Sequence, residues 1–332
     1  MTHHHTQSPN ANGPDWFSPS LRPQPPTKPV LKMTDPFPTY LITPTEYHNV
    51  VANQPPSTST RRIVPLAAGR PTLRPAFEAQ HLPGSKFFDQ SLIRDATSPY
   101  PLMLPTAEGF AAAMTALDIR PSDVLVIYDT YEIGTYSAPR VAWMCAFFGH
   151  GAVHVLNNFR VYADLGFPVS SGGLEGAVTR EPGDVYPVPL IPDPNKVISY
   201  EEVKRLVGNE TSRIVDARIA GRFSGNQSEE DTSLRSGHIP GAVNVPLARL
   251  LDETSKVILP ASKLKDIFEK AGLPVTNEAP QWVLTCNSGV TAAALDLALS
   301  EIGAKGPRRL YDGSWMEWTR RAEKELVVTD SR

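Results

Sequence analysis

The chain repeats itself at a long and constant interval. The segment HLPGSKFF begins at His81, and the related segment HIPGAVNV begins 157 residues later at His238. The apolar run DVLVIYD ends at Asp129, and the run QWVLTC ends at Cys286, again 157 residues later. In each half, small residues, a helical pattern and a further strand follow the apolar run. Two repeats in register indicate a duplicated unit of roughly 130 residues.

The alternation of strands and helices within each repeat predicts the fold class. We expect an α/β protein of two tandem domains, each a mostly parallel sheet with helices on both faces. The predicted domains span 37–168 and 196–324, and the Pro/Gly-rich stretch 169–195 is the predicted linker. Residues 1–36, rich in Pro, Ser, Asn and Thr, are predicted to be a disordered tail. Residues 325–332 form a predicted C-terminal tail.

Composition excludes several classes of function. The 332 residues carry a net charge of −3, so no basic surface for nucleic acid is indicated. The chain has no apolar run as long as a membrane span. Its two cysteines, Cys145 and Cys286, lie far apart, which is typical of a reducing compartment rather than of a disulfide framework. Cys145 lies within VAWMCAFFG, where we expect a buried, inert thiol.

The two copies differ in chemistry at the same strand end. The first copy carries Asp129 there and the second carries Cys286, so only the second can perform thiol chemistry. This difference is typical of a two-domain enzyme with one working site and one inactive copy. Position alone leaves a second interpretation open, in which Cys286 is simply a buried strand residue.

The residues after Cys286 suit an activated thiol. They form a short loop that enters an Ala- and Leu-rich helix ended by Gly303. Ligands of open α/β sheets bind at the carboxyl edge of the strands. There a helix N-terminus and loop N–H groups stabilise an anion, such as a thiolate or a persulfide. The predicted loop residues are Asn287, Ser288, Gly289, Val290 and Thr291.

Two other classes of cysteine enzyme fit the pattern less well. Cysteine phosphatases place an arginine six positions after the nucleophile to grip phosphate, and that position here is Ala292. A cysteine protease needs a histidine base. His238 belongs to the repeated H-[IL]-P-G motif, and its twin His81 stands in the copy without a nucleophile, so we expect both histidines to be structural.

Several motifs in register resemble one known family. VDARIAGRFSG, SGHIPGAVNVP, CNSGVTA and LYDGSWMEW are similar to the catalytic domain of two-domain rhodanese-type sulfurtransferases. HLPGSKFFD, SPYPLMLP, YSAPRVAWMCAFFGH and GFPV resemble the inactive N-terminal domain of that family. The resemblance spans about 37–322 and implies two tandem rhodanese-like domains, the second catalytic.

The resemblance also implies roles for individual residues. Cys286 corresponds to the cysteine that carries sulfur as a persulfide, and Arg222, in GRF, to an arginine that binds the substrate carboxylate. Asn287, Ser288 and the rest of the loop to Thr291 correspond to substrate-binding positions. The thiosulfate branch carries basic residues directly after the cysteine. The uncharged Asn287-Ser288 pair is closer to the 3-mercaptopyruvate branch.

The chain departs from the 3-mercaptopyruvate branch at several positions. The second substrate arginine is replaced by Asp231, and the nearby Arg235 is a candidate replacement. The aspartate and histidine that work with the loop serine are replaced by Ser91 and Leu102. The segment IVPLAAGR also lacks the usual aspartate at the end of its strand. Donor preference therefore stays open between 3-mercaptopyruvate and thiosulfate.

We therefore expect a sulfurtransferase that moves sulfane sulfur through a Cys286 persulfide to cyanide, a small thiol or a thioredoxin-like protein. The resemblance implies no metal and no organic cofactor. The alternative is a sulfur-relay protein that serves a protein acceptor, such as one in tRNA thiolation, and acts weakly on small donors. Location is expected to be mitochondrial or cytoplasmic, because the tail has Arg22 but also Asp15. We expect Trp315, in DGSW, to pack in the core.

Overall fold

The computed structural model describes residues 35–53, 61–173, 185–189, 193–276 and 280–330. All but the last two residues of the predicted N-terminal tail lie outside these ranges, as does much of the predicted linker. The described residues belong to one compact unit, which begins at Thr34.

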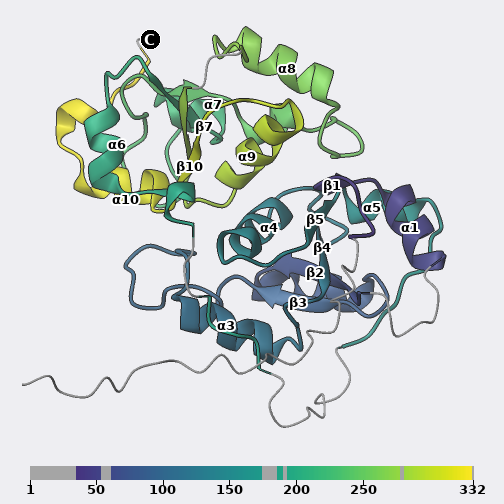
Figure 1. Ribbon diagram of the computed structural model, residues 1–332. Helices are drawn as coiled ribbons and strands as arrows, with labels where there is room; N and C mark the ends of the chain where they lie inside the picture. Colours follow the sequence, from purple (N-terminus) through teal and green to yellow (C-terminus); the bar gives the residue numbers. More distant parts are fainter. Residues whose placement is uncertain (1–34, 54–60, 174–184, 190–192, 277–279, 331–332) are drawn as a thin grey trace, which may run out of the picture. The chain divides into compact units, whose positions relative to one another are not determined.

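The first half of the chain forms a five-stranded sheet (Figure 1). Every pairing between neighbouring strands is parallel, and the spatial order is β1-β5-β4-β2-β3. The strands are β1 (Leu41–Ile42), β2 (Ile63–Gly69), β3 (Lys86–Asp89), β4 (Val124–Asp129) and β5 (Val153–Leu156).

The second half forms a second five-stranded sheet with the same topology. Its order is β6-β10-β9-β7-β8, and its pairings are also parallel. The strands are β6 (Val197–Ile198), β7 (Ser212–Asp216), β8 (Val243–Asn244), β9 (Gln281–Thr285) and β10 (Arg308–Tyr311). The matching order confirms the duplication and the α/β class predicted from the repeats.

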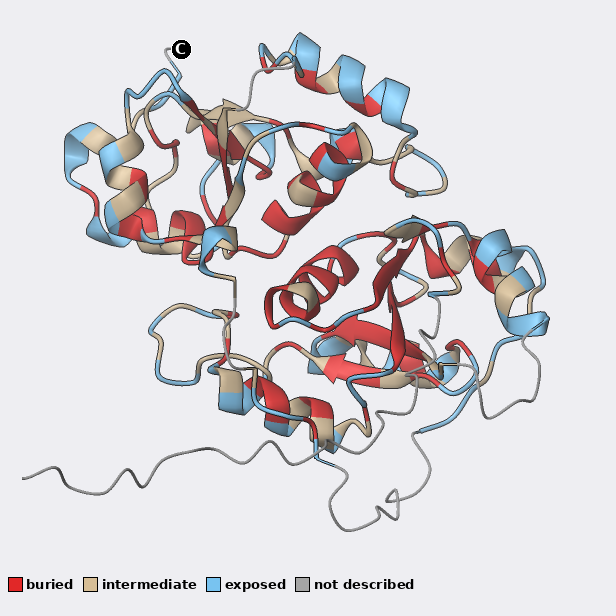
Figure 2. Cartoon of the chain, in the orientation of Figure 1, coloured by how far each residue is buried: buried red, intermediate tan, exposed pale blue. Residues whose placement is uncertain are grey.

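Helices cover both faces of each sheet (Figure 1). In the first half they are α1 (Pro44–Ala52), α2 (Arg74–Ala79), α3 (Ala107–Ala116), α4 (Ala138–Phe147) and α5 (Phe159–Asp164). In the second half they are α6 (Tyr200–Leu206), α7 (Ala220–Ser224), α8 (Ala261–Lys270), α9 (Ala292–Glu301) and α10 (Ser314–Arg321). With both faces covered, the central strands read as continuous apolar runs, and all six residues of β4 are buried (Figure 2).

The packing of α4 on α9 joins the two halves. Nine of the ten residues of α4 and seven of the ten residues of α9 are buried. Both helices are rich in alanine, which lets two backbones approach closely. Each helix contacts its own sheet and the other helix, so one apolar cluster continues from Leu66 of the first sheet to Leu284 of the second. This shared core explains why the two sheets belong to one compact unit.

Buried polar contacts reinforce this junction. The guanidinium of Arg140, on α4, forms an ion pair with the carboxylate of Asp312, which follows β10. The other carboxylate oxygen of Asp312 accepts a hydrogen bond from the backbone N–H of Leu104 at 2.8 Å. Asn157, after β5, exchanges two hydrogen bonds with the backbone of Ile258. The segment after β10 is therefore held by the first half of the chain.

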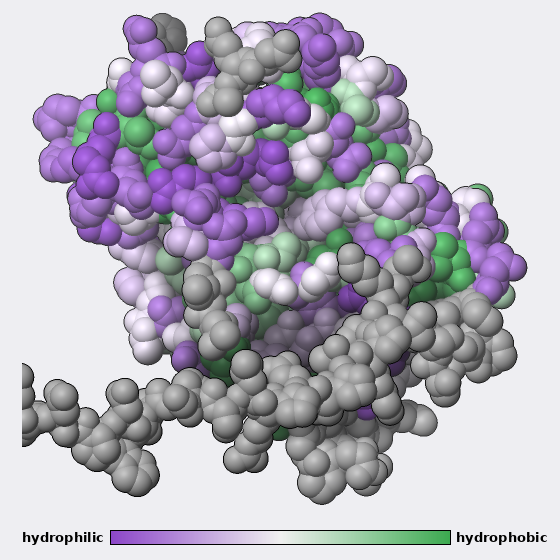
Figure 3. Space-filling model, in the orientation of Figure 1, coloured by the Kyte–Doolittle hydropathy of each residue, from purple (hydrophilic) through white to green (hydrophobic). Residues whose placement is uncertain are grey.

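Polar side chains dominate one region of the face shown in Figure 3. In Figure 3, hydrophilic side chains gather over α6 and α10, whose exposed positions carry Glu and Arg. Among the described residues, no helix is long and apolar enough to cross a membrane.

The buried ion pair yields a stability prediction. Arg140→Met leaves the Asp312 carboxylate buried without its counter-ion, so we expect the free energy of unfolding to fall by about 3–5 kcal/mol. Denaturant unfolding measures this loss. Lys204→Gln, which removes the exposed pair of Lys204 with Glu323, is the control and is expected to cost under about 1 kcal/mol. Equal losses in the two variants would contradict the role given to Arg140.

Candidate active site

Cys286 lies one residue beyond the carboxyl end of β9, with 2% of its surface exposed. Its twin Asp129 is the last residue of β4, so the strand in the second copy ends one residue earlier. The thiol faces a pocket rather than the core alone, because Cys286 is among the residues that line it. This placement favours a working thiol over a purely structural strand residue.

The segment after β10 holds the cysteine loop in place. The backbone N–H of Cys286 donates to the Ser314 hydroxyl at 3.2 Å, and its carbonyl accepts from the N–H of Trp315 at 3.0 Å. The Ser314 hydroxyl in turn donates to the Tyr311 carbonyl at 2.7 Å. Because this segment also contains Asp312, the first half of the chain indirectly supports the loop.

The loop leaves its own N–H groups without protein partners. Gly289 has φ +78°, and a Cβ atom there would lie 2.8 Å from the Asp312 carbonyl oxygen, so only glycine fits. Across the described part of the chain, no protein acceptor takes a hydrogen bond from the backbone N–H groups of 287–291. The helix α9 begins directly after them at Ala292. These donors are left for solvent or for an anion bound beside the thiol.

In the first copy, the N–H groups of the corresponding loop already bind an acidic side chain. The Asp129 carboxylate accepts hydrogen bonds from the backbone N–H groups of Tyr136, Ser137 and Ala138 at 2.7–2.9 Å. These residues lie at the start of α4, the counterpart of α9. Burial raises the pKa of Asp129 to about 6, and the three donors limit that rise. The duplicated loop thus holds an anionic group at this strand end.

The pocket beside Cys286 has a volume of about 670 Å³ and draws its walls from both halves of the chain. Of the predicted site residues, Arg222, Cys286, Asn287, Ser288, Val290 and Thr291 line it. Gly289 does not, because it faces Asp312. The first half contributes Arg70, Ser91, Arg94, Ser98, Pro99, Tyr100, Pro101, Leu102 and Tyr136, and the second half adds Glu230 and Met316.

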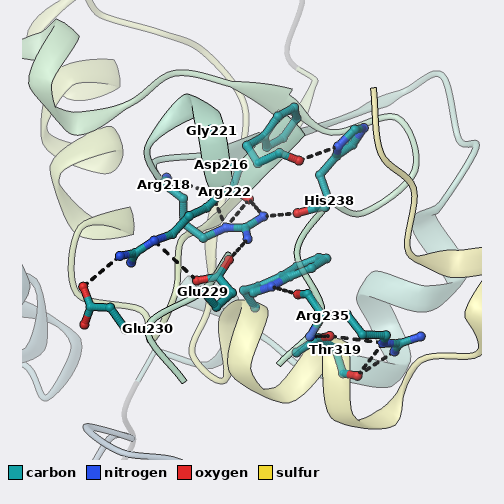
Figure 4. A network of polar contacts seen from close by, with 12 residues as sticks. Asp216, Arg218, Gly221, Arg222, Glu229, Glu230, Arg235, His238 and Thr319 are labelled. Carbon is teal, nitrogen blue, oxygen red and sulfur yellow. Dashed lines mark hydrogen bonds and ion pairs between the residues drawn. The ribbon is translucent and has the colours of Figure 1, made fainter. Parts of the chain in front are cut away.

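Arg222 reaches the pocket from α7 and is tied to two acids (Figure 4). Its Nη2 lies 2.8 Å from Glu230 Oε1, and its Nε lies 3.9 Å from Glu229 Oε2. Glu229 is buried and also bound by Arg218 at 2.9 Å, whereas the Glu230 side chain is 85% exposed. Burial raises the pKa of Glu229, and the two arginines oppose that rise. The positive charge of Arg222 is therefore largely compensated within the protein.

Arg235 does not replace the missing substrate arginine. Its guanidinium donates to the carbonyl oxygens of Thr319 and Ala322, at the end of α10 (Figure 4). These are carbonyls that a helix leaves without partners, so Arg235 acts as a cap. Asp231, at the position of the family arginine, pairs with Arg320 at 2.9 Å. Neither Arg235 nor Asp231 lines the pocket.

The pocket lacks the aspartate and histidine that work with the loop serine in the 3-mercaptopyruvate branch. Ser91 and Leu102, which stand in their places, both line the pocket. The Ser91 hydroxyl donates to Asp89 Oδ1 at 2.6 Å. Among the described lining residues, Glu230 is the only carboxylic acid and there is no histidine.

The two repeated histidines are structural, as predicted. His238 Nδ1 lies 2.9 Å from the Phe223 carbonyl oxygen, and its ring stacks on Phe223 at 4.1 Å. His81 makes the same pair of contacts with Phe77, at 2.9 and 4.5 Å. Identical contacts in a copy without a thiol show that they serve the fold.

Two further predictions about buried side chains are confirmed. Cys145 is fully buried, and desolvation raises the pKa of its thiol well above the ordinary range. Trp315 is 1% exposed and packs in the core of the second half. Its indole N–H donates to the Arg235 carbonyl, and the Arg218 guanidinium lies 4.0 Å from its ring centroid.

Sequence reasoning missed the contribution of the first half to the pocket. Arg70, Arg94 and Tyr136 lie in loops that only the tertiary structure brings to Cys286. One signal was present, since Arg70 closes IVPLAAGR, the segment that departs from the family pattern. Tyr136 and Cys286 line the same pocket, and burial raises the pKa of the Tyr136 phenol.

A tandem α/β protein with a cysteine loop at the carboxyl edge of its second sheet defines a class of thiol-dependent transferase. Among the described residues, no group of three or more His, Cys, Asp and Glu side chains is arranged to hold a metal ion. The family model for a rhodanese-like domain matches residues 199–321.

Named relatives cover most of the chain. The 3-mercaptopyruvate sulfurtransferase of Mus musculus is 37% identical over 260 residues, which are 78% of this chain and 84% of the relative. Thiosulfate sulfurtransferase TUM1 of Saccharomyces cerevisiae is 32% identical over 305 residues, which cover 87% of this chain and 97% of the relative. The chain therefore belongs to the two-domain rhodanese-type sulfurtransferases and is itself a sulfurtransferase.

Solved structures agree with this assignment. The crystal structure of Tum1 from Saccharomyces cerevisiae superposes with a TM-score of 0.78 at 31% identity and covers 88% of this chain and 98% of that chain. The sulfur transferase subunit of yeast mitochondrial complex I superposes with a TM-score of 0.75 at 27% identity. The superposition covers 88% of this chain and 100% of that chain.

The raised pKa of Asp129 yields a pH prediction. With a pKa of about 6 when folded and 3.8 as its ordinary value, the folded state binds this proton more tightly than the unfolded state. The stability from this group is present at low pH and is lost as pH rises through 6. Relative to Asp129→Asn, native stability should fall by up to about 3 kcal/mol between pH 4 and pH 7. Urea unfolding of both proteins at several pH values measures this, and a constant difference would contradict it.

Proposed function

We propose that Cys286 is the residue that carries sulfur during transfer. The observation that supports this most is a thiol on a pocket wall beside five loop N–H groups that have no protein acceptor in the described part of the chain. Such a loop stabilises a thiolate and, after the first step, a persulfide anion. The donors therefore favour the charged forms through which sulfur must pass.

In the first half-reaction, the Cys286 thiolate attacks the transferable sulfur of the donor. A sulfur–sulfur bond forms, and the bond joining that sulfur to the rest of the donor breaks with its electron pair. With thiosulfate the leaving group is sulfite. With 3-mercaptopyruvate it is the pyruvate enolate, which takes up the proton of the donor thiol to give pyruvate. In both cases Cys286 ends as a persulfide anion.

In the second half-reaction, the acceptor takes the outer sulfur. Cyanide attacks that sulfur, thiocyanate leaves, and the Cys286 thiolate is restored without any change in net charge. A thiol acceptor follows the same course and carries the persulfide away. Ser288, which lines the pocket next to the cysteine, is the residue we assign to moving the thiol proton.

The remaining site residues bind the donor and the sulfur anion. Loop residues 287–291 supply N–H donors, and Arg222 positions the donor anion in exchange for its contact with Glu230. The domain at 196–324 is the catalytic one. The domain at 37–168 is the inactive copy, because the carboxylate of Asp129 occupies the position of the thiol. The uncharged Asn287-Ser288 pair favours 3-mercaptopyruvate as donor, with thiosulfate as the second candidate.

A second candidate function is sulfur relay to a protein acceptor, for example in tRNA thiolation. A second pocket of about 330 Å³ adjoins the first and shares Tyr136, Arg222, Asn287 and Thr291 with it. Its other lining residues include Ile219, Leu247, Ala248 and Leu251. This partly apolar pocket, next to the one that Cys286 lines, suits the side chains of a thioredoxin-like partner. A mitochondrial or cytoplasmic location fits either function, and one structural relative is named as a subunit of a mitochondrial complex.

The direct test is thiocyanate formation from cyanide, with 3-mercaptopyruvate and thiosulfate compared side by side. We expect turnover with both, faster with 3-mercaptopyruvate, and a loss of roughly 1,000-fold or more in Cys286→Ser, because serine cannot form the persulfide. Mass spectrometry after donor treatment without acceptor should show one added sulfur atom on Cys286.

Cys145→Ala is the matched control, since the second thiol is fully buried away from the pocket. It should keep its turnover and its persulfide. Loss of activity in this control with Cys286→Ser still active would contradict the assignment. Negligible turnover with both donors, together with a persulfide that passes to a thioredoxin-like protein, would favour the relay function.

A further inference from the structure

The residues that line the active-site pocket include more positively than negatively charged side chains. Three arginines line it, namely Arg70, Arg94 and Arg222, against one carboxylic acid, Glu230. Two of these arginines come from the first domain, which holds no thiol at the equivalent strand end. The position of the missing family arginine is Asp231, and that side chain is paired elsewhere.

The guanidinium of Arg222 already faces two carboxylates. It contacts Glu230 at 2.8 Å and approaches the buried Glu229 at 3.9 Å (Figure 4). Glu229 is also held by Arg218 and cannot move away without breaking a buried ion pair. A donor that binds Arg222 must therefore compete with at least one internal carboxylate.

Arg70 is differently placed. It follows β2 at the carboxyl edge of the first sheet and is exposed on the pocket wall. Within the described residues, it makes no ion pair. Its charge helps to lower the pKa of Glu230 and opposes the rise in the pKa of Tyr136. Arg70, Glu230, Tyr136 and Cys286 all line the same pocket.

Arg94 makes its hydrogen bonds to neutral backbone groups, and its charge also helps to lower the pKa of the neighbouring Asp95. Its Nε donates to the Ser91 carbonyl oxygen at 2.9 Å, and its Nη1 donates to the Asp95 carbonyl oxygen at 3.2 Å. The neighbouring Asp95 carboxylate is engaged by the N–H and hydroxyl of Thr97. Two backbone carbonyls thus fix the orientation of the guanidinium, while its Nη2 has no protein acceptor among the described residues.

We propose that Arg70 and Arg94 of the first domain bind the anionic group of the sulfur donor, in place of the arginine that the second domain lacks. The proposal rests on the sulfur-transfer function proposed above. The shared ligand chemistry is a small oxyanion, either the carboxylate of 3-mercaptopyruvate or the sulfonate of thiosulfate. Guanidinium groups suit both, because each presents paired N–H donors to two oxygens. The first domain is then part of the binding site rather than a support alone.

The test uses three variants, namely Arg70→Gln, Arg94→Gln and the double variant that carries both changes. Arg74→Gln is the control. Arg74 is four residues from Arg70, is partly exposed, pairs with Glu78 and does not line the pocket. In the double variant we expect the KM for the donor to rise roughly ten- to hundredfold, the loss typical of hydrogen bonds to charged groups. The kcat should change far less, and the control should match the native protein.

The two donors distinguish the two sources of oxyanion. A rise in both KM values supports a shared oxyanion site, and a rise for one donor alone assigns the site to its carboxylate or its sulfonate. Glu230→Gln should lower the KM, because it removes the internal competitor of the donor. Unchanged KM values for both donors in the double variant would overturn the proposal.

A second readout does not depend on sulfur transfer. Iodoacetate is anionic and iodoacetamide is neutral, and both alkylate a thiolate. The arginines should raise the rate of Cys286 alkylation by iodoacetate relative to iodoacetamide, and the double variant should reduce that ratio about tenfold. A native protein that is alkylated in this selective way but transfers no sulfur would refute the proposed function and leave the anion site standing. A ratio equal to that of Arg74→Gln would refute the anion site.

Discussion

The buried contact between Arg140 and Asp312 is the constraint on which the site depends. Asp312 follows the last strand of the second sheet, and the next residues fix the backbone of Cys286 through Ser314 and Trp315. Because Asp312 also accepts the N–H of Leu104, the first half of the chain anchors the segment that positions the thiol. An ion pair this deeply buried is costly to break, so it couples the two halves firmly.

The duplication produced two similar loops, one after β4 and one after β9, and their backbone N–H groups have different partners. In the first copy the Asp129 carboxylate accepts hydrogen bonds from three backbone N–H groups. In the second, Cys286 stands at the same strand end, and no acceptor among the described residues takes a hydrogen bond from the N–H groups of its loop. In the first copy, the loop N–H groups are therefore already taken by a side chain of the protein. The loop of the second copy leaves its donors open to solvent or to an anion, so the two copies differ in hydrogen bonding at the same strand end.

Local patterns were enough to predict most of the fold and the position of Cys286 at the end of a strand. Apolar runs that alternate with helical patterns predicted both sheets. The small residues after Cys286 predicted the loop that follows β9. The structural roles of His81 and His238 also followed from the repeat. The suggestion that Arg235 replaces a substrate arginine was wrong, because closeness in sequence does not determine where a side chain points. Its guanidinium turns to the end of α10 and caps that helix.

The sequence by itself determined that this chain is a duplicated α/β protein with one thiol at the carboxyl edge of its second sheet. These features depend on hydrophobic periodicity and on residue identity, which are local properties. The tertiary structure alone decided which groups surround that thiol. Arg70 and Arg94 lie in loops about 200 residues from Cys286, and they reach the pocket because the two halves pack together, through α4 on α9 and through the contact of Arg140 with Asp312. Such contacts arise from the packing of whole domains, and no short stretch of sequence encodes them.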